Sequence, residues 1–291
     1  MSLVLVSTSF ASAAPVDANS IVYTDLILSS SADFVFEAQT ASTALFDTAA
    51  LTAGGEANAT ARVDLSTGEL GTDARVSALA PGSSFIDSFA FSAWNEFVTF
   101  SADASIAFSL RTDGRLSTAG ASDFSEVGSS LNVYDVTDQT TVFDGTLLNS
   151  DTISNRIFTA RDLINVSGTS INPLDRGVNC RAANVACLSG NAIDQLLDTA
   201  ITGTLSVQAG RTYLFGSSLF SAAGRAGPGV GPAASDFLST AVFAFDDLDG
   251  ASFTSSSGEF LSANQLTPVP LPAGFPLLLG ALAGLAFLRR R

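Results

Sequence analysis

The sequence predicts an all-β protein, an antiparallel β-sandwich (jelly-roll-like) with one loop-and-helix insertion, which is followed by a C-terminal transmembrane helix. Short apolar-polar alternations recur along most of the chain, and Gly, Asp, Asn and Ser separate them. Alternation with a period of two is typical of half-buried strands, and the separating residues favour turns. The third observation is an uncharged segment of membrane-spanning length near the end of the chain.

Composition narrows the chemistry that the protein could perform. Only 14% of the 291 residues are charged, so Ser, Thr, Asn and Asp must supply most of the polar surface, which suits β-rich folds. The formal net charge of −15 argues against a nucleic-acid partner. Histidine is absent and all 13 basic residues are Arg, which excludes Ser–His–Asp and Cys–His catalysis, imidazole metal ligands and lysine Schiff bases. A carboxylate pair, as in glycoside hydrolysis, is the catalytic arrangement that remains.

Residues 16–263 are expected to form the sandwich. Its strands are predicted by DFVFEAQ (Phe34, Phe36), SFIDSFAF (Phe85, Phe89, Phe91), ASIAFSLR (Ile106, Phe108, Leu110), SLNVYDV (Val133), RTYLFGSSLF (Tyr213) and TAVFAFDD (Phe243, Phe245). The dipeptides Asp113-Gly114, Asp144-Gly145 and Asp249-Gly250 suit tight hairpins. The 22 phenylalanines are expected to fill the core between the sheets, and an exposed Phe stripe for ligand stacking is the alternative.

The segment at about 149–200 departs from this pattern, so we expect an insertion between strands. Its helix is predicted by GNAIDQLLDTA, in which Ile193, Leu196, Leu197 and Ala200 fall at helical spacing. Cys180 and Cys187 stand seven residues apart in the same segment, and in an oxidising compartment we expect a local disulfide between them. Two cysteines without histidine would leave the shell of a zinc ion incomplete.

The segment FDDLDGAS places Asp246, Asp247 and Asp249 within four residues, which makes them a candidate calcium ligand set. The spacing and the closing Glu of an EF-hand loop are missing, so a solvated hairpin turn is the favoured interpretation. The segment GRAGPGVGP lacks the flanking strand and helix of a nucleotide-binding loop, and we expect a surface loop. We therefore expect no cofactor, with calcium at the three aspartates as the one metal candidate.

The N-terminus has features of a signal peptide over residues 1–13. The stretch from Leu3 to Phe10 is largely apolar, and Ala11 and Ala13 fit the small-x-small pattern of signal-peptidase sites. The basic leader that normally precedes the apolar stretch is missing, which favours a start upstream of Met1. These features predict export by the Sec machinery and cleavage by signal peptidase.

The C-terminus predicts a membrane-spanning helix with a fixed orientation. Ala273 to Leu288 are sixteen uncharged residues, and the twenty from Val269 would extend about 30 Å as a helix, the thickness of a hydrocarbon core. Arg289, Arg290 and Arg291 are expected to stay cytoplasmic, which leaves the rest of the protein outside. Pro270 and Pro272 push Val269 and Leu271 towards extended conformations, the form in which proteases usually bind substrates.

Val269-Pro270-Leu271-Pro272-Ala273, the apolar segment and the terminal arginines together resemble the VPLPA variety of the PEP-CTERM sorting signal. The resemblance covers residues 269–291, after a linker at 264–268. It implies that exosortase, an integral-membrane cysteine protease of Gram-negative bacteria, removes the tail and that the protein reaches the cell surface or the extracellular matrix. The commoner motif has Glu where this chain has Leu271, which leaves the exosortase subtype open.

These observations and the resemblance favour a non-enzymatic, exported surface or matrix protein that is transiently anchored in the inner membrane and associated with exopolysaccharide. One alternative is a carbohydrate-binding module on the same sandwich, with Trp94 or Tyr213 as stacking platforms. The other is a carboxylate-dependent polysaccharide hydrolase or lyase. The expected partners are exosortase, the Sec machinery, signal peptidase and exopolysaccharide.

Overall fold

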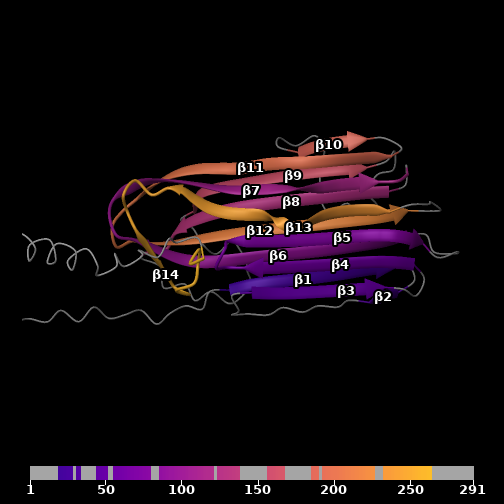
Figure 1. Ribbon diagram of the computed structural model, residues 1–291, viewed down its shortest axis with the longest axis horizontal. Coiled ribbons are helices and arrows are strands. Elements are labelled where there is room, and N and C mark those ends of the chain that lie inside the picture. Colours follow the sequence, from indigo (N-terminus) through magenta and orange to yellow (C-terminus); the bar gives the residue numbers. More distant parts are fainter. Residues whose placement is uncertain are drawn as a thin grey trace, which may run out of the picture.

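The computed structural model describes residues 19–28, 31–33, 44–51, 55–79, 85–120, 123–137, 156–167, 185–189, 192–226 and 232–263. Within these residues the chain forms two β-sheets and no helix, so the expectation of an all-β protein is confirmed. The strands of both sheets run along the long axis of the molecule (Figure 1). The longest strand has 16 residues, which extend about 50 Å at ~3.3 Å per residue.

The two sheets are named sheet A and sheet B. Sheet A contains β1 (Asn19–Leu28), β2 (Ser31–Asp33), β6 (Phe85–Phe100), β8 (Asp123–Asp135), β9 (Arg156–Ser167), β10 (Val185–Ser189), β12 (Thr212–Ala226) and β14 (Phe253–Ser255). Sheet B contains β3 (Ala44–Leu51), β4 (Gly55–Asp64), β5 (Glu69–Leu79), β7 (Ala104–Thr118), β11 (Ile193–Val207) and β13 (Ala233–Asp247). The order across sheet A is β10-β9-β8-β12-β6-β1-β2, with β14 beside the end of β6, and across sheet B it is β11-β7-β13-β5-β4-β3. The described neighbours pair antiparallel except β9 and β10, which run parallel.

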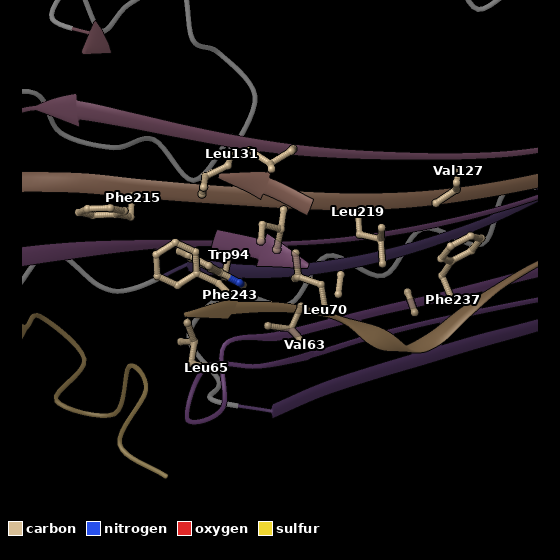
Figure 2. Packing of buried hydrophobic residues seen from close by; sticks show 14 of the residues in the cluster. Val63, Leu65, Leu70, Trp94, Val127, Leu131, Phe215, Leu219, Phe237 and Phe243 are labelled. Carbon is tan, nitrogen blue, oxygen red and sulfur yellow. The ribbon is translucent and has the colours of Figure 1, made fainter. Parts of the chain in front are cut away.

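The sheets pack face to face, strand over strand. Strand β1 lies over β3 and β4, β6 over β4 and β5, β12 over β5 and β13, and β8 over β13 and β7. Along β6 every second residue points into the space between the sheets, as Ile86, Ala90, Trp94 and Val98 do. Figure 2 shows side chains from both sheets meeting in this space. The period of two in the sequence therefore corresponds to one shared core between two layers.

One end of the core is aromatic. Trp94 of β6 is completely buried, and its ring lies 5.3 Å from that of Phe243 on β13 and 4.9 Å from that of Phe260. Phe215 of β12 meets Phe108 of β7 edge to face at 5.9 Å. Such edge-to-face and tilted pairs are favourable beyond the apolar area that they bury. The aromatic end thus fastens sheet A to sheet B with large side chains from both.

The other end of the core is richer in Ala, Ser and Thr, and hydrogen bonds of side-chain hydroxyls cross it from sheet to sheet. They join the hydroxyls of Thr72 and Ser221 at 2.7 Å, Ser88 Oγ to the Asn58 carbonyl at 2.5 Å, and Ser235 Oγ to the Glu126 carbonyl at 2.7 Å. Short side chains can bridge the sheets only where the layers approach closely. At this end hydroxyl hydrogen bonds therefore join the two sheets, in place of large rings.

A buried ion pair belongs to the same end. The side chains of Asp123 on β8 and Arg225 on β12 are both 0% exposed, and the two residues are register partners. Arg225 Nε donates to Asp123 Oδ1 at 2.7 Å, and Nη2 donates to Oδ2 at 2.9 Å. Asp123 Oδ2 also accepts hydrogen bonds from the backbone nitrogens of Ala119 and Gly120, at 3.1 and 3.0 Å. The carboxylate thus ties the end of β7 in sheet B to β8 and β12 in sheet A.

The glycine turns behave differently from the hairpins that were expected. Asp249 and Gly250 do form a turn, with φ angles of 49° and 77°, but it leads from β13 in sheet B to β14 in sheet A. Asp113 and Gly114 lie inside β7, so the expected turn there is wrong. A Cβ at position 114 would stand 2.4 Å from the Asp236 carbonyl oxygen, so glycine is required there by a close approach of β13. Asp144 and Gly145 lie outside the described residues.

The expected helix is wrong. Residues 193–207 form strand β11, in which exposed side chains alternate with less exposed ones along the whole length. Ile193, Leu197 and Ile201 face the core, whereas Leu196 and Ala200 face outward. An insertion between strands was expected at about 149–200. In the described residues of this segment, β9 and β10 are instead strands of sheet A.

Several expectations concern segments outside the described residues: Phe34 and Phe36, the signal peptide at 1–13, and the transmembrane helix at 273–288. In the part of the chain that the structure describes, no helix has the length and apolar character needed to cross a membrane.

Candidate functional site

The outward face of sheet B carries rows of paired Arg and Asp side chains. Arg115 on β7 makes a two-point ion pair with Asp194 on β11, and Arg111 approaches Asp198 at 3.8 Å. Arg75 on β5 donates to Asp73 at 2.8 Å and to Asp236 on β13 at 2.7 Å. The rows thus alternate hydrogen-bond donors and acceptors across four strands.

An open depression of about 700 Å³ lies among these rows. Its lining includes Arg111, Asp113, Arg115, Leu196, Asp236 and Val242, which come from β7, β11 and β13. Leu196 is 74% exposed, so an apolar side chain stands beside the charged ones.

A bulge in β13 shapes the strands around the depression. The register of β13 shifts between Phe237 and Ala241 against β5 and between Asp236 and Ala241 against β7. Each neighbouring strand has a glycine at this point: a Cβ on Gly71 would stand 1.9 Å from the Leu238 carbonyl oxygen, and Gly114 is similarly crowded by Asp236. Bulges bend strands and re-aim side chains, and here the two glycines make room for the bulged backbone.

The charged groups on this face hold one another in place. The hydrogen bonds from Arg115 lower the pKa of Asp194, and Asp194 raises the pKa of Arg115. Burial raises the pKa of Asp73, while the hydrogen bond from Arg75 opposes that rise. Guanidinium groups donate, carboxylates accept, and Leu196 and Val242 add apolar area. The depression can therefore hydrogen-bond a flat, hydroxyl-rich ligand through several groups at once.

The outward face of sheet A is aromatic. Phe89 of β6 and Phe220 of β12 stack with ring centroids 5.8 Å apart. Phe220 covers Gly128 on β8, and Phe124 covers Gly224 on β12, because a Cβ on either glycine would stand 2.2 Å from the ring opposite. Such rings shield the backbone that glycine leaves bare. The expectation that phenylalanine fills the core between the sheets is thus right for Phe108, Phe215 and Phe243 but wrong for the outward residues Phe85, Phe89 and Phe91.

The carboxyl group of Glu96 lies inside the aromatic end of the core. Its exposure is 0%, and Oε1 accepts hydrogen bonds from Ser256 Oγ at 2.7 Å and from the Ser257 backbone nitrogen at 2.9 Å. Among the described residues, Glu96 Oε2 and the Trp94 Nε1 of the same strand have no hydrogen-bond partner. Burial raises the pKa of Glu96, and the hydrogen bonds from Ser257 and Ser256 only partly offset it. Glu96 fastens the segment after β14 to β6 at the cost of a buried carboxyl group.

We expect the variant Glu96→Gln to change how stability depends on pH. A raised pKa means that the folded state binds the proton more tightly than the unfolded state, whose ordinary value is 4.5. The contribution of Glu96 to stability is therefore fully present below pH ~4.5 and is lost as pH rises through the folded-state pKa. The glutamine side chain of the variant does not ionise. In urea unfolding, the free energy of unfolding of the variant should therefore rise relative to that of the wild type from pH 4 to pH 7. A difference that stays constant over this range contradicts the assignment.

Asp246, Asp247 and Asp249 are exposed, and each accepts a hydrogen bond. Asp246 Oδ1 accepts a hydrogen bond from Ser109 Oγ at 2.9 Å, and Asp247 Oδ1 accepts one from the Asp249 backbone nitrogen at 2.8 Å. Asp249 Oδ2 accepts one from the Ser105 nitrogen at 3.2 Å. Within the described ranges, no three His, Cys, Asp or Glu side chains are grouped so that they could hold a metal ion. The calcium candidate therefore gains no support from this geometry.

The two proposed stacking platforms are not on the surface. Trp94 is 0% exposed and Tyr213 is 2% exposed, and the Tyr213 hydroxyl accepts a hydrogen bond from the Gln208 backbone nitrogen at 2.9 Å. Both rings lie in the aromatic end of the core. The assignment of these two residues as platforms is therefore wrong.

The remaining predicted site residues are not covered by the structure. Ala11, Ala13, Val269, Pro270, Leu271, Pro272, Ala273, Arg289, Arg290, Arg291 and Cys180 lie outside the described residues. Cys187 lies in β10, and its disulfide with Cys180 stays a prediction.

Sequence reasoning missed the residues of the depression. The signal that could have found them is the spacing of two along Arg111, Asp113 and Arg115 and along Asp194, Leu196 and Asp198. Comparisons with protein-family models, with curated proteins and with solved structures found no match for this chain.

Proposed function

We propose that this chain is an exported, non-enzymatic protein of the cell surface or extracellular matrix, which an exosortase-type protease releases from the membrane and which associates with exopolysaccharide. The observation that carries the proposal is the tail, in which Val269–Ala273, an uncharged segment and three terminal arginines follow one another in this order. Each part has its own role: the prolines present an extended backbone, the apolar stretch occupies the bilayer, and the arginines fix the orientation.

The end of the described domain supports this proposal. Phe260 and Leu261 are buried, and the backbone nitrogens of Leu261 and Ala263 donate to the carbonyls of Leu65 and Ser66 at 2.9 and 3.0 Å. These contacts hold the chain against the β4–β5 turn just before the tail. Only residues 264–268 separate them from the sorting motif. Cleavage within the motif therefore removes no residue that the described core uses.

We further infer that the two facing sheets form a β-sandwich domain that is suited to a polymer-rich environment. Its outward faces offer a charged depression on sheet B and half-buried phenylalanines on sheet A. Loss of the three terminal arginines takes the formal charge from −15 to −18, which favours solubility of the released protein.

Mass spectrometry of the protein released by its native host tests the proposal. We expect an N-terminus close to Ala14 and a C-terminus within or just before Val269–Ala273, with Arg289–Arg291 absent. Intact chains that carry the last arginine and fractionate with the cytosol overturn it.

A further inference from the structure

Strand β11 forms one edge of sheet B in the described part of the chain. Its 15 residues all pair with β7 in one continuous register, without a bulge. Proteins usually protect such edges with Pro, Lys, bulges or very short strands. Strand β11 contains no Pro and no Lys, and it is long and regular. It is therefore a ready template for another strand.

Apolar side chains gather at this edge. Within the described ranges, the exposed large hydrophobic residues are Leu196 at 74% and Ile157 at 43%. Leu196 lies on the outward face of β11 in sheet B, whereas Ile157 belongs to β9 in sheet A. On the inner side of β11, Ile193, Leu197 and Leu205 are only partly buried although they pack on the core. A strand added beside β11 would cover the partly buried side chains of β11.

The order of the strands leaves a place for such a strand. Strand β9 of sheet A lies over β11 of sheet B, and sheet A continues with β10. Among the described strands, β10 has no counterpart in sheet B. A seventh strand in sheet B, next to β11, would face β10 and extend both layers to the same width.

The sequence of β11 fits a second copy of itself. In an antiparallel pair centred on Ala200, Asp198 lies opposite Thr202, Asp194 opposite Ser206 and Leu196 opposite Thr204 of the second copy. On the inner face, Ile193 meets Val207 and Thr199 meets Ile201. Registers centred on residues 194, 196 or 198 would place carboxylates opposite one another, which destabilises a pair, and a shift by one residue would exchange the two faces. The register with the full 15-residue overlap is free of this charge repulsion.

We propose that this edge is a self-association surface, through which a second copy of the chain adds its β11 antiparallel and makes sheet B continuous across a two-fold dimer. A two-fold axis at Ala200 keeps the inner faces of both copies on one side, so the two cores also become continuous. This inference goes beyond the proposed function and does not depend on it, because it rests on residues 193–207 and not on the tail.

Cysteine cross-linking tests both the dimer and its register. Ala200 is exposed, and two copies of Ala200→Cys would face each other across the axis with Cα atoms about 4.5–5.5 Å apart, within disulfide range. The full chain, purified in a mild detergent, should give a disulfide dimer with this variant, while the oxidised wild type controls for Cys180 and Cys187. Leu196→Cys or Thr204→Cys alone should not cross-link, but a mixture of these two variants should. Failure of Ala200→Cys to cross-link, or equal cross-linking by Thr204→Cys alone, overturns the proposal.

A charge pair at the same interface gives a second test that needs no oxidation. Thr202 would lie opposite Asp198 of the second copy, twice per dimer by symmetry. Thr202→Lys should tighten the dimer and Thr202→Asp should weaken it, each by roughly 2- to 30-fold in dissociation constant. Sedimentation equilibrium measures both against the wild type. A wild type that stays monomeric at high concentration, or a shift of the same sign for both variants, rejects the interface.

Discussion

Replacing Asp123 by Asn will destabilise the domain by about 3–5 kcal/mol, the largest stability loss that we expect from a single polar substitution. The change removes the carboxylate that accepts from Arg225 Nε and Nη2 inside a region where both side chains are 0% exposed. The guanidinium then loses its two-point bond to this carboxylate in a medium of low polarity, and less of its desolvation cost is offset. Urea unfolding at neutral pH measures the loss as a lower midpoint with an unchanged slope.

The exposed pair Arg115–Asp194 provides the matched control. It has the same two-point geometry as the buried pair, but water surrounds both partners. We expect Asp194→Asn to change the midpoint little, because exposed ion pairs contribute little to stability. The double variant Asp123→Leu with Arg225→Met should recover part of the loss, because no unpaired charge is left behind. Equal effects of Asp123→Asn and Asp194→Asn would show that burial does not set the strength of the pair.

The strands with two-residue alternation were predictable because their pattern has a direct physical cause. On β7, Ile106, Phe108 and Leu110 are all fully buried, and on β8 so is Val133. The alternation does not reveal which face is inward when both faces are apolar. For this reason the inward face of β6 was predicted wrongly. Phe85, Phe89 and Phe91 point outward, whereas Trp94 and the small residues between them point into the core.

The error at β11 has a similar origin. Ile193, Leu196, Leu197 and Ala200 satisfy a helical spacing, but Ile193, Leu197 and Ile201 also satisfy a spacing of two or its multiples. Pairing with β7 decides between helix and strand. As a strand, all 15 residues of the segment pair with β7, and an isolated helix would lack these interactions. The information that resolves the ambiguity therefore lies in β7, about 90 residues earlier in the chain.

The candidate site could not be found from sequence for a related reason. Its depression needs the bulge between Phe237 and Ala241 and the glycines at 71 and 114 on the two flanking strands. Gly114 follows Asp113 and so looks like a turn signal, although it in fact makes room for the backbone of β13. Close approach between strands that are far apart in sequence has no local signature. The alternating charged residues of β7 and β11 can be read from the sequence, but the pairing of these two strands cannot.

Replacing both Pro270 and Pro272 by Ala will block release of the protein, so that the full chain with its tail accumulates in the membrane fraction. The two prolines each fix φ near −65° and hold the preceding residue extended, and alanine removes both restraints. The apolar segment and the arginines are untouched, so insertion and orientation should persist while cleavage fails. Immunoblotting of membrane and secreted fractions measures the ratio of uncleaved to released chain.

Pro268→Ala is the matched control, because Pro268 directly precedes the motif and lies outside it. This variant should be released as the wild type is, which separates recognition of the motif from a general effect of proline on the linker. The described domain ends at Ala263 with its own hydrogen bonds to the β4–β5 turn, so neither change should alter its thermal unfolding. If the double variant is released normally and has lost its arginines, the prolines do not form the recognised strand. The apolar segment and its basic end would then be all that directs the cleavage.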